Sequence, residues 1–217
     1  MFIHYGKIKK GKLNLNDSVE LSIDYERRKN IRAYHSATHL LHESLRRTLG
    51  KHVMQKGSLV APDRLRFDFS HMKPISESEL DKINDIVNQI VDNKSDVITR
   101  LMTPKEGMEH GALALFGEKY GEEVRVVFMG EEGNKYFSTE LCGGTHVRNT
   151  SEVGKFKVVS QSAIASGVRR VEALRDKQLE KYLTEKEKNL NVASQKDQDQ
   201  IDDLIDQIKK LGGKPNM

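Results

Sequence analysis

The stretch NIRAYHSATHLLHESLRRTLG (residues 30–50) places three histidines within eight positions of a segment with the pattern of an amphipathic helix. The glycine that ends it is a natural stop for a helix. At about 100° per residue, His35, Thr38, His39 and His42 fall in one polar stripe about 100° wide. A neighbouring apolar stripe predicts docking on a core, so we expect the polar stripe to face something specific.

Composition limits the classes of protein to consider. The chain has 217 residues, 31% charged and 36% hydrophobic, which is enough for one sizeable domain with appendages. No apolar run approaches the roughly 18 residues of a membrane span, and the N-terminus lacks the apolar core of a signal peptide. The only cysteine, Cys142, excludes an internal disulfide and fits a reducing compartment, so we expect a cytoplasmic location and no membrane partner. The net charge of +4 permits an anionic partner such as RNA without requiring one.

Three unequal parts follow from the pattern along the chain. The alternation in KLNLNDSVELSID predicts one or two hairpins within residues 1–28, too short to bury a core alone. Residues 29–174 contain the turn and helix-capping residues typical of a domain with both helices and strands. Residues 175–217 are rich in charge, and Leu204 and Ile208 lie at helical spacing there, so we expect a helical arm weakly tied to the main domain.

The main domain alternates helices with strands at hairpin spacing. A second helix is expected at 76–93, where Ser76 and Glu79 form a capping box, and a short helix at 105–117. Strands are expected at 57–62, 64–70, 96–102, 124–130, 135–142, 154–163 and 167–174. This arrangement predicts an α+β fold, with a mainly antiparallel sheet packed with helices.

The stretch STELCGGTHV (residues 138–147) separates a cysteine from a histidine by a glycine pair that lets the backbone turn tightly. Thiolate and imidazole are preferred zinc ligands, and zinc takes four of them tetrahedrally. His35 and His39 at positions i and i+4 of the first helix, with Cys142 and His146 from this loop, make one such set. The sequence therefore predicts one zinc site between a helix and a loop.

Other readings of the same residues stay open at this point. His35 and His39 would also suit a solvated polar face, and Cys142 would suit a small buried apolar position. A zinc site with four protein ligands would be structural, because no position is left for water. A metalloprotease is improbable, because Ser36 stands where the H-E-x-x-H motif has its glutamate base.

Four motifs in order resemble the editing domain of alanyl-tRNA synthetases. They are HSATHLLHESLRRTLGKHVMQKGSLVAPDRLRFDFSH, GALALFGEKYGEEVRVVFMG, STELCGGTHV and GVRRVEA, and the resemblance covers roughly residues 1–190. It implies hydrolysis of Ser-tRNA(Ala) and Gly-tRNA(Ala) by residues 29–174. Residues 1–28 resemble the end of the β-barrel that precedes editing in that family. Residues 175–217 resemble the start of its C-terminal oligomerisation region, which implies self-association in the full enzyme.

The resemblance also implies roles for particular residues. It makes His35, His39, Cys142 and His146 the ligands of one zinc per chain. It places Thr38 and Gln55 in the pocket where the wrong amino acid is inspected. A threonine at position 38 has an alternative, which is to donate its hydroxyl to the helix carbonyl of residue 34.

Contacts with the partner, the acceptor end of tRNA(Ala), are expected from basic residues. The candidates are Arg169 and Arg170, with Lys56, Arg64 and Arg66. A solvated strand face explains the same charges equally well. No side chain is identified as the general base; Glu140, His42 and Asp68 are candidates, each with a structural alternative.

No ATP-binding or aminoacylation motif is visible, so we do not expect this chain to charge tRNA, and ATP would serve only an aminoacylation domain outside it. The pattern suggests a segment of a longer synthetase. Alternatives are a freestanding editing protein of the same superfamily, the related threonyl editing domain, and a zinc-stabilised RNA-binding module without catalysis. The LFGEKYG stretch (residues 115–121) and the charged tail favour the alanyl synthetase.

Overall fold

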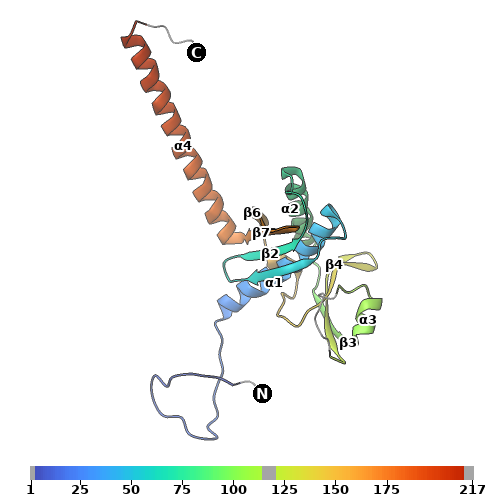
Figure 1. The fold of residues 1–217 in the computed structure, drawn as a ribbon. Coiled ribbons are helices and arrows are strands. Elements are labelled where there is room, and N and C mark those ends of the chain that lie inside the picture. Colours follow the sequence, from blue (N-terminus) through green and yellow to red (C-terminus); the bar gives the residue numbers. More distant parts are fainter. Residues whose placement is uncertain (1–2, 114–120, 213–217) are drawn as a thin grey trace.

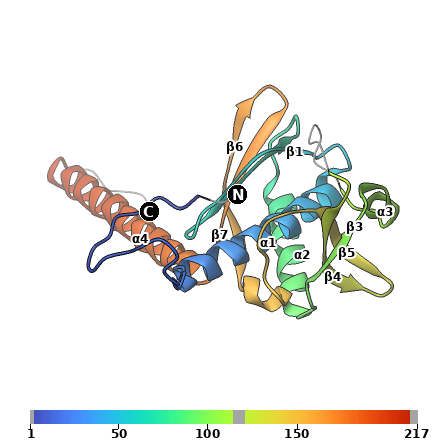
Figure 2. The ribbon, with the colours of Figure 1, turned by 90° about the horizontal axis from the view of Figure 1, so that it is seen from below.

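Helix α1 (Tyr25–Leu49) runs through the middle of the main domain and contacts both of its sheets (Figures 1 and 2). The computed structural model describes residues 3–113 and 121–212. The side chain of Asp24 accepts the backbone N–H of Arg27 to cap α1, and Gly50 ends the helix with a positive φ of 119°. Buried residues run almost without interruption from Ala33 to Leu45. Because both sheets and another helix surround it, α1 is buried on more faces than an amphipathic pattern predicts.

The strands form two antiparallel sheets, which confirms the predicted α+β class. The four-stranded sheet has the order β1-β2-β7-β6, and the three-stranded sheet has the order β3-β4-β5. The bounds are β1 (Gln55–Val60), β2 (Leu65–Ser70), β3 (Ile98–Met102), β4 (Val124–Glu132), β5 (Lys135–Leu141), β6 (Phe156–Ala165) and β7 (Val168–Arg175). Every predicted strand is present within two residues of its expected bounds.

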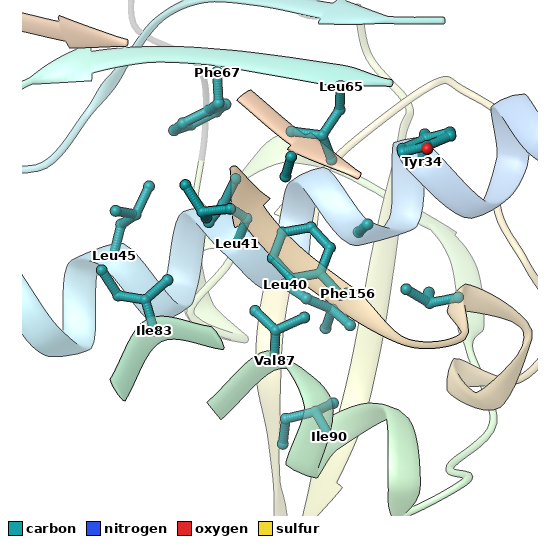
Figure 3. Packing of buried hydrophobic residues seen from close by; sticks show 14 of the residues in the cluster. Tyr34, Leu40, Leu41, Leu45, Leu65, Phe67, Ile83, Val87, Ile90 and Phe156 are labelled. Atoms are coloured by element: carbon teal, nitrogen blue, oxygen red, sulfur yellow. The ribbon is translucent and has the colours of Figure 1, made fainter. Parts of the chain in front are cut away.

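The main core lies between α1, α2 (Glu77–Asp92) and the inner face of the four-stranded sheet, and it also includes Val127, Met129 and Phe137 of the three-stranded sheet. Figure 3 shows apolar side chains of α1 meeting Phe67 of β2 on one side and Ile83 and Val87 of α2 on the other. The predicted capping box of α2 is confirmed, since Ser76 and Glu79 exchange side-chain and backbone hydrogen bonds. This packing fixes α1 against β2 and α2, and so fixes the histidines that α1 carries.

Two predictions about local structure are wrong. Residues 3–24 form no strand, and their side chains are exposed, so the predicted hairpins are absent there. Their apolar residues have no sheet to pair with among the described residues, and an isolated hairpin is marginal in water. The short helix α3 spans Pro104–Glu109 and ends well before residue 117, because Leu113 instead forms a bridge with Glu140 of β5. Residues 114–120, which hold most of the LFGEKYG stretch, lie outside the described residues.

A short 3-10 helix, η1 (Thr150–Val153), precedes β6. After β7 comes α4 (Asp176–Lys210), a helix of 35 residues that projects from the main domain (Figure 1). Leu179 is its one buried residue, and Leu204 and Ile208 are 57% and 40% exposed. The expected weakly tied helical arm is confirmed. No helix in the described ranges has the length and apolarity to cross a membrane.

Candidate metal centre

The four side chains predicted as zinc ligands lie together where α1 meets the loop after β5. His35 and His39 come from successive turns of α1, and Cys142 and His146 come from the loop. One possible ligand atom from each residue lies within 4.8 Å of the other three. The helix pair and the loop pair therefore converge as the tetrahedral set requires.

The imidazole rings present one nitrogen to the cluster and the other to a protein acceptor. Nε2 of His35 and Nε2 of His146 lie 3.4 and 3.3 Å from Sγ of Cys142. Nδ1 of His35 lies 3.2 Å from the carbonyl oxygen of Thr145. Because a carbonyl only accepts, this contact places the ring proton of His35 on Nδ1 and leaves Nε2 with a lone pair.

His39 provides the clearest indication that the cluster fits a metal. Its Nδ1 pairs with Oε2 of Glu140 at 2.7 Å. Its Nε2 is buried and has no hydrogen-bond partner among the described residues. Buried polar atoms nearly always have a partner, and a cation bound by imidazole and thiolate would satisfy this one.

The loop that carries Cys142 is fastened to β4 through Arg125. The N–H of Cys142 donates to the carbonyl of Arg125 at 2.9 Å, and Nε of Arg125 donates to the carbonyl of Cys142 at 3.0 Å. The same guanidinium donates to the carbonyl of Gly144. A Cβ at Gly144 would overlap the ring of His35, so only glycine lets the loop approach α1 this closely.

The charges around the cluster favour a thiolate. Burial would raise the pKa of Cys142, but the neighbouring imidazoles of His146, His35 and His39 outweigh it and lower the pKa to about 3. Burial lowers the pKa of His146 to about 4, which keeps that ring neutral at pH 7. Thiolate and neutral imidazole are the forms that bind zinc.

Glu140 is the buried acid of the site. Its two oxygens pair with Nδ1 of His39 and with Nδ1 of His42, the second at 3.1 Å. Burial would raise the pKa of Glu140, but the two imidazoles outweigh this effect and hold the pKa well below its usual range. Burial would lower the pKa of His39, but the carboxylate of Glu140 outweighs this effect and raises the pKa. Glu140 and His42 are 6% and 5% exposed. As candidates for the general base, both therefore have a structural role that explains them, and Glu140 orients His39, a candidate metal ligand.

The two predicted pocket residues have different surroundings. Thr38 is buried, and its hydroxyl donates to the carbonyl of Tyr34 at 2.8 Å, which is the alternative that its helical position allowed. Its oxygen can still accept a hydrogen bond. Gln55 is the first residue of β1 and is half-buried.

The two predicted phosphate ligands are each held by a neighbour. Arg170 forms a bidentate pair with Asp68, at 2.7 and 2.9 Å, which gives that base candidate a structural role as well. Arg169 donates to Gln161 at 2.9 Å. Nε of Arg66 lies 3.5 Å from Oδ2 of Asp68. The side chains of Lys56 and Arg64, the other basic candidates, are exposed.

Sequence reasoning missed two residues that the site uses. Arg125 is a strand residue whose role depends on the loop partner 17 positions away. The sequence marks Ser36 only as the residue at the glutamate position of the H-E-x-x-H motif. In the structure its Oγ contacts both His146 and Val147. The signal available in the sequence for the second was its position directly after the candidate ligand His35; its full burial is seen only in the structure.

Part of the chain matches a known domain. Residues 124–172 match the family described as the threonyl and alanyl tRNA synthetase second additional domain. The match covers β4 to β7 and includes Cys142 and His146, and it does not extend to α1.

Curated proteins similar to this chain are alanine–tRNA ligases. The relative from Chelativorans sp. (strain BNC1) is 51% identical over 216 residues, 97% of this chain and 24% of the relative. The relatives from Mesorhizobium japonicum and Parvibaculum lavamentivorans are 53% and 55% identical over 89% and 84% of this chain, and 22% and 21% of their own lengths. The chain thus spans about a quarter of the length of the curated relatives it matches.

Proposed function

Because the chain is homologous to a segment of the alanine–tRNA ligases and carries the second additional domain of the threonyl and alanyl synthetases, we propose that it is an editing deacylase. Its substrates would be Ser-tRNA(Ala) and Gly-tRNA(Ala), whose ester bonds it would hydrolyse. The observation that carries the proposal is the convergence of three imidazoles and one thiolate, of which Cys142 and His146 lie within that domain match. A cytoplasmic location belongs to the same proposal.

A separate editing site answers a physical need. Glycine differs from alanine by one methyl group, a difference that binding discriminates by only about 1–3 kcal/mol. Serine adds a hydroxyl that a small apolar pocket cannot strongly reject. A second site that favours the hydroxyl can remove the errors that the first site makes.

The metal in this proposal is zinc, because a thiolate with three imidazoles is a zinc-type donor set. His35, His39, Cys142 and His146 would hold it, one ion per chain. When bound, it would supply a positive charge that fixes the terminal adenosine and the ester. Four protein ligands leave no position for a water, so we assign the ion an orienting role.

The protein side chains would do the rest by positioning. Thr38 and Gln55 would read the amino acid, and Arg169 and Arg170 would hold acceptor-end phosphates through the N–H groups that their neighbours leave free. An aminoacyl ester is labile, so holding a water and stabilising an oxyanion can suffice without a dedicated base. The curated relatives' ligase activity and its ATP are not assigned to this chain, and self-association through α4 is proposed for the full enzyme only.

Thr38→Val is expected to slow hydrolysis of Ser-tRNA(Ala) by up to about tenfold, since one neutral hydrogen bond contributes about 0.5–1.5 kcal/mol. Valine keeps the shape of threonine, so zinc content should not change. Single-turnover deacylation measures the effect, and Gly-tRNA(Ala) is the matched control, because glycine has no hydroxyl to lose. Equal slowing of both esters would show that Thr38 does not read the serine hydroxyl.

Deacylation also separates this proposal from two of its three alternatives. A zinc-stabilised RNA-binding module would bind tRNA without hydrolysing either ester. The threonyl editing domain would prefer a seryl ester on a different tRNA. A freestanding editing protein would act on the same esters in isolation from any synthetase.

A further inference from the structure

Ser36 links the two halves of the cluster. It is fully buried on α1, directly after the candidate ligand His35. Its Oγ accepts the backbone N–H of Val147 at 3.1 Å and lies 3.2 Å from Nδ1 of His146. One hydroxyl therefore contacts two consecutive residues of the ligand loop, 110 and 111 positions away in sequence.

The contact with His146 has a consequence for metal binding. If Nε2 of His146 is to offer a lone pair to a metal, the ring proton must sit on Nδ1, where it needs an acceptor. The carbonyl of Thr145 is the corresponding acceptor for His35, and Glu140 is the acceptor for His39. Ser36 fills this position for the third histidine.

The usual behaviour of a buried helical serine does not explain Ser36. Such a hydroxyl commonly bonds the carbonyl four residues earlier. Ser44 does so with Leu40 at 2.8 Å on the same helix, and Thr38 does so with Tyr34. Among the described residues Ser36 has no such bond, and its oxygen is directed to the loop instead.

We propose that Ser36 is a positioning residue of the metal centre. Its Oγ accepts the Nδ1–H of His146 and so orients Nε2 toward the other ligands, while the bond from Val147 fastens the end of the ligand loop to α1. The inference rests on the proposed metal centre. It assigns a role to the residue that occupies the place of the glutamate base in metalloproteases.

The test compares Ser36→Ala with Ser44→Ala. Both variants remove one fully buried hydroxyl from α1, and only the first removes a contact with the loop. Competition with a chromophoric chelator measures zinc affinity. We expect Ser36→Ala to bind zinc about 10–100-fold more weakly, the range typical for losing an outer hydrogen-bond partner of a ligand, and Ser44→Ala to bind as the wild type does.

Amide hydrogen exchange on the metal-free proteins is the second readout. The amide of Val147 should exchange faster in Ser36→Ala and not in Ser44→Ala, whereas a general loss of stability would affect many amides in both. Wild-type zinc affinity in Ser36→Ala would overturn the inference. If the wild-type chain bound no zinc, the metal centre itself would be wrong; faster exchange at Val147 would then still support the tie to the loop, and unchanged exchange would refute it.

Discussion

Cys142→Ala is expected to lower zinc affinity by more than the roughly 100-fold that losing an outer partner can cost, because it removes a ligand itself. The wild-type chain, purified without chelator, should hold about one zinc. The three remaining imidazoles share the cluster with no thiolate to neutralise the metal. Metal analysis and chelator competition measure the change, and deacylation of Ser-tRNA(Ala) should fall with it.

His110→Ala is the control for this variant, since it removes an exposed imidazole outside the cluster. It should keep both zinc and activity. The α+β core of Cys142→Ala should survive, because its buried residues come mainly from α1, α2 and the four-stranded sheet, and Cys142 is only a partly buried residue packed against them. A Cys142→Ala chain that bound one zinc with unchanged affinity would show that the thiolate is not a ligand.

Glu140→Ala is expected to destabilise the metal-free chain by about 3 kcal/mol, the lower end of the cost of breaking a buried ion pair. The lower end applies because His39 can lose its proton once the carboxylate that raises its pKa is gone. Zinc affinity should also fall about 10–100-fold, since His39 loses the acceptor on Nδ1. Urea unfolding and chelator competition measure the two effects.

Glu132→Ala is the matched control for the loss of a carboxylate. Glu132 pairs with Arg47 on the surface, where both side chains are 38% exposed. Such a pair contributes about 0–1 kcal/mol, so unfolding should change little and zinc affinity should not change. Equal destabilisation by the two variants would contradict the role given to Glu140.

Much of the architecture could be predicted because it follows from local patterns. The capping box at Ser76 located α2, and alternation located the strands within two residues. The four residues of the candidate metal site could also be picked out, since each half is local: two histidines one helical turn apart, and a cysteine four residues before a histidine. Only the meeting of the halves required the fold.

The features of the site that the sequence did not predict depend on contacts between residues far apart in the chain. The tie from Ser36 to the loop spans 110 positions, and the pair between His39 and Glu140 spans 101. Nothing in a local pattern tells which strand residue will lie under a given helix residue. The wrong expectation for residues 3–24 has the opposite cause, since their alternation is real but no partner strand is present among the described residues.

The most direct test of the central claim is hydrolysis of Ser-tRNA(Ala) and of Ala-tRNA(Ala) by the zinc-loaded chain, before and after chelation. The account predicts that the seryl ester is cleaved much faster than the alanyl ester, and that chelation removes this activity and added zinc restores it. Equal rates for the two esters, or cleavage no faster than in buffer by a chain that holds zinc and binds the tRNA, would contradict it.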